Sequence, residues 1–489
     1  MLKTAGWLLP AILALAGCSS YGQRHEQTLS QALTALGQDK ALIGASSGVM
    51  VRDAESGTVL YQAQAEQRLA PASNMKMFTS LAAFGVLGAD YRFETRLLTT
   101  GEQRGDTLRG DLYLQGSGDP TLHPDDLDTF AATLAQRGIR HIHGRLILDA
   151  SAFDQTPFGA GWSWDDEPFA FAAPISALNY AFTPGGDINV VRVDVQPGAR
   201  AGAPGRVSFY PANDAVTLVN RTTTTGGDTA LTFDRQPGSN RIVVSGTVAA
   251  QAEASSRLIT VDQPARVVGA LLQNALRAHG ITLRGNAEEG VTPAGARLLA
   301  EKTSPPLSRL AVTFLKVSNN GYGEVLTKAM GRKTQGKGDW AAGLQAIGRF
   351  VQSQGIEAGA YRQVDGSGLS RMNQITPQQL TTLLLAARKQ PWFADWYNAL
   401  PIAGQPGLLV GGTLRSRMVK SAAAGRAHAK SGSMTGVSSL SGYVDSATGR
   451  PLAFAIISNN YLVPGAEVKA LEDRLVETLA ACDATVVCR

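Results

Sequence analysis

Ser73 and Lys76 are the first residues of the chain whose types and spacing could do chemistry together. On a helix, residues three apart lie on one face, about one turn from each other. A serine hydroxyl is a poor nucleophile until a base removes its proton. A lysine in a dry site can be that base, because burial disfavours the ammonium. A helix N-terminus would add amide donors for the developing negative charge. Alone, the pattern is common on surface helices, so it needs support from elsewhere in the chain.

A second candidate group is Ser318 and Asn320, which lie in a break between two helical stretches. In a bent segment, residues two apart can point the same way. The hydroxyl can then pass a proton toward a leaving amine, and the amide can hold a substrate backbone near a lysine. By itself, Ser-x-Asn is a common loop pattern.

The third group is Lys430, Ser431, Gly432 and Ser433, which begin or cross a predicted strand. Gly432 removes a side chain where another backbone must come close. Such a strand edge suits a peptide that binds as an extra strand with a terminal carboxylate. The backbone N–H groups of Ser433 and Ser73 would then form the two donors of an oxyanion hole. For this motif taken alone, a solvated strand end is the alternative.

The elements around these motifs predict an antiparallel sheet with flanking helices. Apolar residues 81–87 follow Ser73 and Pro71 precedes it, which indicates a buried helix entered just after a proline. Alternating patterns predict a hairpin before this helix and further strands near the C-terminus. These strands are expected at residues 46–53, 58–63, 425–432, 437–444 and 452–458.

The residues between the first two motifs have a different texture, with short strand patterns separated by Gly, Pro, Asp and Thr loops. Joints near residues 116–120 and 183–187 predict an insertion nested inside an insertion. The expected parts are a signal segment (1–17), a main domain (18–91 and 306–489), a β-rich insertion domain (92–116 and 187–305) and a nested smaller insertion domain (117–186).

The composition excludes several classes of function. The chain has 489 residues and a net charge of +5, with basic residues that are scattered, so no nucleic-acid partner is indicated. His141 and His143 alternate on a predicted strand, but no further ligands give a metal spacing, and we expect no metal or organic cofactor. Cys482 and Cys488 lie at the C-terminus, and the sequence leaves open whether they form a disulfide.

The N-terminus has the pattern of an export signal. Lys3 precedes a short apolar stretch, residues 7–16, which is too short to span a bilayer. Residues 15–18, Leu-Ala-Gly-Cys, resemble the bacterial lipoprotein signal, in which the cysteine, here Cys18, is lipidated and becomes the mature N-terminus. By the same resemblance, Ser19 favours the outer membrane over the inner one. The alternative is an ordinary cleaved signal in which Cys18 is incidental.

The three motifs occur together in the order Ser-x-x-Lys, Ser-x-Asn, Lys-Ser-Gly, a set found in penicillin-binding proteins and class A β-lactamases. With its long insertion, the chain resembles the class C low-molecular-mass penicillin-binding proteins, the D-alanyl-D-alanine carboxypeptidase/endopeptidase family. Three further segments typical of that family are residues 118–122, 365–371 and 411–415. The resemblance implies an α+β fold: a penicillin-binding-protein/serine β-lactamase-like transpeptidase domain interrupted by a large β-rich insertion.

The resemblance also implies roles for single residues. Ser73 would be the acylated nucleophile and Lys76 its proton acceptor, while Ser318, Asn320 and Lys430 would assist proton transfer and bind substrate. A pocket that reads the free end of the stem-peptide side chain would use four residues: Asp166, Arg371, Met434 and Thr435. For Asp166 a solvated acidic loop is the alternative, because acidic residues adjoin it on both sides. The third motif has Ser431 where the family has threonine, from which we expect modest tuning.

These observations predict a periplasmic, lipid-anchored serine hydrolase that cleaves peptidoglycan stem peptides or cross-links and is acylated by penicillin. The carboxypeptidase and endopeptidase modes share one chemistry, and the sequence does not rank them. One rival is a β-lactamase, but the chain has no Glu-x-x-Leu-Asn segment of the class A type. A second rival is a catalytically silent wall-binding scaffold. The oligomeric state stays open.

Overall fold

The computed structural model describes residues 27–482 and 487–488. A five-stranded antiparallel sheet forms the centre of the main domain, with strand order β19-β20-β21-β2-β3. Its strands are β2 (Ser46–Asp53), β3 (Val59–Ala63), β19 (Ala427–Met434), β20 (Val437–Asp445) and β21 (Pro451–Asn459). The sheet therefore joins the two ends of the chain, as the sequence predicts.

Each face of this sheet is covered by helices. Successive strand residues point to opposite faces, so neighbouring apolar residues of one strand enter two different cores. Val444 of β20 packs into the core under α1 (Leu29–Gly37) and α10 (Gly465–Ala481). Its neighbour Tyr443 packs into the core on the other face. The helices of that second layer are α2 (Met75–Val86), α5 (Leu307–Lys316), α6 (Asn320–Gln335), α7 (Trp340–Ser353), α8 (Pro377–Ala387) and α9 (Phe393–Asn398).

Helix α2 lies inside the main domain rather than on its surface. Every residue from Met75 to Phe84 is buried, including Lys76. A helix that is buried all round belongs to the core of a large domain, so the predicted buried helix is confirmed. The short 3₁₀ turn η2 (Ala72–Asn74) precedes α2 and carries Ser73.

Helices α5 and α6 are separated by a sharp turn, also as predicted. Ser318 has a positive φ of 62°, which a residue with a side chain rarely adopts. Asn319 is the N-cap of α6, and its side chain accepts a hydrogen bond from Tyr322 N at 3.2 Å.

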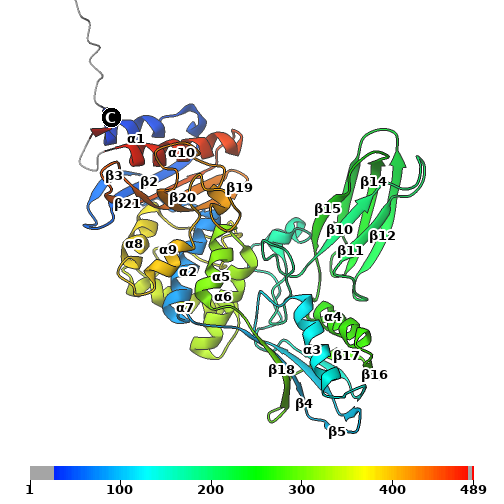
Figure 1. The fold of residues 1–489 in the computed structure, drawn as a ribbon. Helices are drawn as coiled ribbons and strands as arrows, with labels where there is room; N and C mark the ends of the chain where they lie inside the picture. The colour runs from blue at the N-terminus through cyan, green and yellow to red at the C-terminus, as the bar shows by residue number, and fades with distance from the viewer. Residues whose placement is uncertain (1–26, 483–486, 489) are drawn as a thin grey trace, which may run out of the picture.

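The insertion projects from the side of the main domain on which α5 and α6 lie (Figure 1). One part has two sheets, of strand order β17-β9-β7-β4-β18 and β16-β8-β6-β5, and two helices. Its elements are β4 (Glu94–Thr99), β5 (Glu102–Arg104), β6 (Thr107–Arg109), β7 (Leu112–Gly116), α3 (Pro124–Gln136), β8 (His141–His143), β9 (Leu146–Asp149), α4 (Pro264–Ala278), β16 (Thr282–Leu283), β17 (Ala287–Glu289) and β18 (Arg297–Thr303).

The other part of the insertion consists of two three-stranded sheets, β11-β10-β15 and β12-β14-β13. Its strands are β10 (Val190–Gln196), β11 (Arg206–Tyr210), β12 (Thr217–Thr225), β13 (Ala230–Arg235), β14 (Arg241–Ala249) and β15 (Ser255–Thr260). Because β9 pairs with β7 on one side and with β17 on the other, strand pairing does not follow the nested division at residues 117–186. We instead propose that residues 187–260 form one body and the rest of the insertion another.

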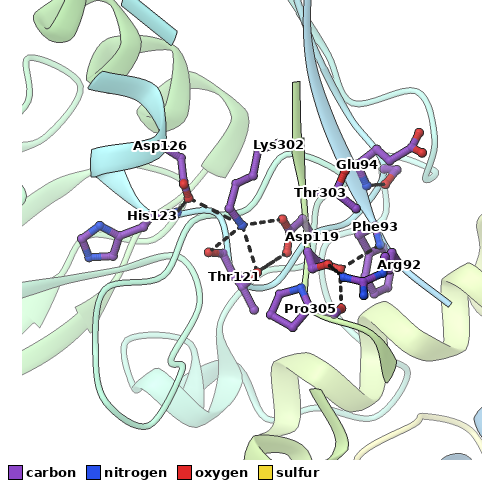
Figure 2. A network of polar contacts seen from close by, with 12 residues as sticks. Arg92, Phe93, Glu94, Asp119, Thr121, His123, Asp126, Lys302, Thr303 and Pro305 are labelled. Carbon is purple, nitrogen blue, oxygen red and sulfur yellow. Dashed lines mark hydrogen bonds and ion pairs between the residues drawn. The ribbon is translucent and has the colours of Figure 1, made fainter. Parts of the chain in front are cut away.

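Strand β18, which leads from the insertion back to the main domain, is held by a polar network (Figure 2). Lys302 Nζ lies 3.0 Å from Asp119 Oδ2 and 3.5 Å from Asp126 Oδ2, and it donates to Thr121 O at 3.2 Å. Asp119 is almost fully buried, so its charge requires such a partner. Lys302 lies near the end of β18, and the network fixes this strand to the segment that follows β7.

Three further points concern the ends of the chain. Strand β1 (Gln27–Thr28) pairs with β22 (Val487–Cys488), and Cys482 is disulfide-bonded. Cys18 lies outside the described residues. Within those residues, no helix is long and apolar enough to cross a membrane.

Candidate active site

The three predicted motifs meet at the junction of α2, α6 and β19. Lys76 Nζ lies 3.0 Å from Ser73 Oγ and 2.6 Å from Asn320 Oδ1. Lys430 Nζ donates to Ser318 Oγ at 2.8 Å. Residues from three distant parts of the chain thus lie close together, since the charge of Lys76 also acts on Lys430.

The contacts of Lys76 define how its amine is oriented. Besides Asn320 Oδ1, Nζ donates to the backbone carbonyl of Ser367 at 2.7 Å. A neutral amine has two N–H groups and one lone pair, whereas an ammonium has three donors. As an ammonium, Lys76 can donate to all three oxygens, Ser73 Oγ included. As a neutral amine with both N–H groups on the two carbonyl-type oxygens, it would direct its lone pair at the Ser73 hydroxyl.

Burial makes the neutral form of Lys76 accessible. The side chain has no exposed surface, and this desolvation lowers its pKa to about 7. The negative charges of Glu324 and Asp365 act in the opposite direction and favour the ammonium. Lys76 can therefore both accept and return a proton near neutral pH.

Lys430 is a second fully buried lysine of the site. It donates to Ser431 O at 2.5 Å in addition to Ser318 Oγ. Burial holds the pKa of Lys430 well below its usual value, and the charge of Lys76 lowers it further. Its partner Ser318 is held in a strained backbone conformation, with φ at 62°.

Gly432 allows β19 to approach the nucleophile. A Cβ at this position would lie 2.6 Å from Pro71 O and 2.9 Å from Ser73 N, and it would overlap the Ser439 hydroxyl. The backbone of β19 therefore passes directly beside the Ser73 N–H group. Since Ser433 follows Gly432 in the strand, its N–H and that of Ser73 are suited to bind one oxyanion.

The insertion contributes backbone groups to the site. Asn320 Nδ2 donates to the Phe171 carbonyl at 2.8 Å, and this bond fixes the amide so that Oδ1 faces Lys76. Asn319 Nδ2 donates to Gly185 O and Gly186 O, each at 3.0 Å. The start of α6 is thus held from the insertion side as well as by its own domain.

The residues expected to form a side-chain pocket are partly brought together. Arg371 Nη2 donates to Thr435 O at 2.7 Å, just beyond Met434 at the end of β19. Asp166 is within electrostatic reach of Arg371: burial and the charge of Asp165 raise the pKa of Asp166, and the charge of Arg371 lowers it. In the third motif, Ser431 Oγ lies 2.8 Å from Thr413 Oγ1, so the shorter residue still has a hydroxyl partner.

Sequence reasoning missed the residues that hold the Lys76 amine in place through hydrogen bonds. Ser367 O accepts a hydrogen bond from Lys76 Nζ, and Glu324 accepts hydrogen bonds from the Gly366 and Ser367 N–H groups. The position of Glu324, one helical turn after Asn320, is a signal that could have been used. Among the described residues, no group of His, Cys, Asp and Glu could hold a metal ion.

The chain matches the model of the D-Ala-D-Ala carboxypeptidase 3 (S13) family over residues 29–482. It is 41% identical over 480 residues to the D-alanyl-D-alanine carboxypeptidase of an Actinomadura species, which covers 97% of this chain and 88% of that protein. It is 28% identical to D-alanyl-D-alanine carboxypeptidase DacB of Haemophilus influenzae, with 89% of each chain covered.

A similar structure is the crystal structure of penicillin binding protein 4 (dacB) from Haemophilus influenzae. It has a TM-score of 0.80 at 27% identity and covers 91% of this chain and 98% of that chain. A structure of the same protein complexed with a β-lactam has a TM-score of 0.76. The α+β fold predicted from the sequence is therefore confirmed.

We predict that Gly432→Ala will slow acylation of the protein by a β-lactam about 100-fold, because the added Cβ must push β19 away from the Ser73 N–H. Stopped-flow measurement of the acylation rate would test this. Gly37→Ala is a matched control, since a Cβ there meets nothing within 4 Å. Equal rates for the two variants would contradict the close approach of β19 to Ser73.

Proposed function

Because the chain belongs to the D-Ala-D-Ala carboxypeptidase 3 (S13) family, we propose that Ser73 is its acylated nucleophile and Lys76 the base that activates it. The enzyme is a serine-type D-Ala-D-Ala carboxypeptidase, as the sequence predicts. The observation that supports the assignment of residues is the position of the Lys76 amine, which lies 3.0 Å from Ser73 Oγ while Asn320 Oδ1 and Ser367 O accept its other two hydrogen bonds.

In the proposed acylation step, Ser73 Oγ attacks the carbonyl carbon of the penultimate D-Ala as its proton passes to Lys76 Nζ. The N–H groups of Ser73 and Ser433 bind the oxyanion that forms. When the peptide C–N bond breaks, Lys76 Nζ gives up that proton, which reaches the leaving amine through Ser318 Oγ, with Lys430 beside it, and Lys76 is neutral again. Water then attacks the ester while its proton passes to Lys76 Nζ. The same proton moves on to Ser73 Oγ as the ester bond breaks, which releases Ser73 and the shortened peptide.

The same chemistry extends to cross-linked stem peptides and to β-lactams. In both, an amide carbonyl is presented to the nucleophile, and only the leaving group differs. We therefore propose peptidoglycan stem peptides and cross-links as substrates and penicillin as an acylating inhibitor. The β-lactam complex of the Haemophilus influenzae relative supports the last point.

We expect the soluble form of the enzyme, begun after Cys18, to gain the mass of benzylpenicillin, and the Ser73→Ala variant to gain none. Intact-mass spectrometry after incubation with the drug checks this. A lasting adduct on the parent protein alone supports Ser73 as the nucleophile with slow deacylation. Drug consumption without an adduct would indicate a β-lactamase, and neither event would indicate a silent scaffold.

We also propose that Asp166 and Arg371, with Met434 and Thr435, bind the free end of the stem-peptide side chain. A carboxylate and a guanidinium that influence each other suit an end that carries both an amino group and a carboxylate. Trp162 Nε1, from the loop that leads to Asp166, donates to Asp365 Oδ2 at 3.0 Å and so holds this loop near Arg371.

On this basis Asp166→Asn should lower kcat/KM about 5-fold for a stem peptide with a free side-chain amine, the worth of one exposed ion pair. It should leave kcat/KM unchanged for the same peptide with that amine acetylated. Asp165→Asn is the control, because Asp165 is the more exposed neighbour. The pocket assignment fails if both variants respond alike to acetylation.

Finally, we propose that the enzyme acts in the periplasm, anchored by a lipid on Cys18 to the outer membrane. The support is the sequence of residues 15–19. In cell fractionation, Cys18→Ala should move the enzyme from the membrane fraction to the soluble periplasmic fraction, while Ser20→Ala should not. Retention of Cys18→Ala in the membrane would overturn the anchor.

A further inference from the structure

Glu324 is a fully buried carboxylate that the proposed reaction steps do not use. It lies on α6 one turn after Asn320, so the two side chains share a face of the helix. Its Oε1 accepts from Ser367 N at 2.7 Å, and its Oε2 accepts from Gly366 N and Trp340 Nε1, each at 2.8 Å. The carbonyl of that same Ser367 is the acceptor for Lys76 Nζ.

We propose that Glu324 is a positioning residue for Lys76: its carboxylate holds the Ser367 peptide against the amine and supplies a negative charge close to it. The first effect orients the lone pair, because Ser367 O occupies one of the two N–H groups of the neutral amine. The second effect sets how readily the amine gives up a proton. This inference rests on the proposed role of Lys76 as the base.

The hydrogen bonds of Glu324 favour its anionic form. All three of its partners are N–H donors, and a protonated carboxyl would place a donor where an acceptor is needed. Burial and, after it, the charge of Asp365 raise the pKa of Glu324 to about 7, and these three donors oppose that shift. The bonds to the carboxylate are charge-assisted and therefore rigid supports for the peptide that they hold.

Other charged groups surround Glu324. Asp365 accepts from Gly368 N and Ser370 N at 2.8 and 2.7 Å, and its charge raises the pKa of Glu324. On α6, Lys328 Nζ lies 2.6 Å from Asp154 Oδ1. On α2, Lys76 faces both carboxylates, and on α7 Trp340 faces Glu324 with a neutral donor. Asp339, which precedes α7, acts on Lys328.

The test is the pH dependence of acylation by benzylpenicillin between pH 5 and pH 9. In the parent enzyme the rate should rise through about pH 7 as Lys76 loses its proton. In Glu324→Gln a negative charge is removed, so the ammonium is less favoured and the pKa of Lys76 falls. The midpoint should therefore move to lower pH by about 1 unit. The plateau should fall about 10-fold, because the amide places a donor against an N–H group.

Glu472→Gln is the matched control. Glu472 is also fully buried, but it pairs with Arg417 and Ser438 on the other face of the sheet. This variant should keep the parent midpoint whatever its stability. A midpoint of Glu324→Gln equal to that of the parent would overturn the role of the charge, and an unchanged plateau would overturn the positioning role. If the parent itself is not acylated, the proposed function fails instead.

A second variant covers the case in which Glu324→Gln does not fold. Trp340→Phe removes one N–H donor from Glu324 and keeps a ring beside Lys328, whose Nζ lies 3.7 Å from the Trp340 ring centroid. Loss of the donor raises the pKa of Glu324, which leaves less negative charge beside Lys76. The midpoint should again move to lower pH, by less than in Glu324→Gln. A move to higher pH would overturn the inference.

Discussion

The burial of two lysines in one cluster is the constraint on which the site depends. Lys76 and Lys430 have no exposed surface, and an isolated ammonium in such a place is very costly. The cost is met by lowering their affinity for a proton, which is the property that a base needs. That requires α2 inside the domain and β19 against its N-terminus, and Gly432 is the residue that permits this contact.

The carboxylates of the site are arranged so that the pKa of Lys76 stays low. Neither Glu324 nor Asp365 contacts Lys76 directly; each accepts hydrogen bonds from backbone N–H groups of the 365–370 loop. A direct ion pair would hold the ammonium and raise the pKa of the base. The Ser367 peptide between the Glu324 carboxylate and the Lys76 amine lets the carboxylate orient the amine. Because the two charged groups are not in contact, the carboxylate raises the pKa of Lys76 less than a direct ion pair would. The site therefore contains buried carboxylates that form no direct ion pair with Lys76.

The sequence predicted those parts of the fold and site that depend on local pattern. The apolar run after Ser73, the break around Ser318 and the edge strand at Lys430 each form where their neighbours in sequence favour them. The supports of the site were not predictable in this way. Glu324 meets Gly366 across 42 positions, and Asn320 meets Phe171 across 149. The pairing of β9 with both β7 and β17 was likewise not predictable, because the sequence pattern of a strand does not specify its partner strands.

The insertion shows why residue types alone could not reveal all of the site. Its contacts with the start of α6 are made by the backbone carbonyls of Phe171, Gly185 and Gly186. A carbonyl is present at every position, so no particular side chain marks these residues in the sequence. Yet the Phe171 carbonyl determines which end of the Asn320 amide faces Lys76. The segment that carries it therefore borders the active site, although 149 positions separate Phe171 from Asn320.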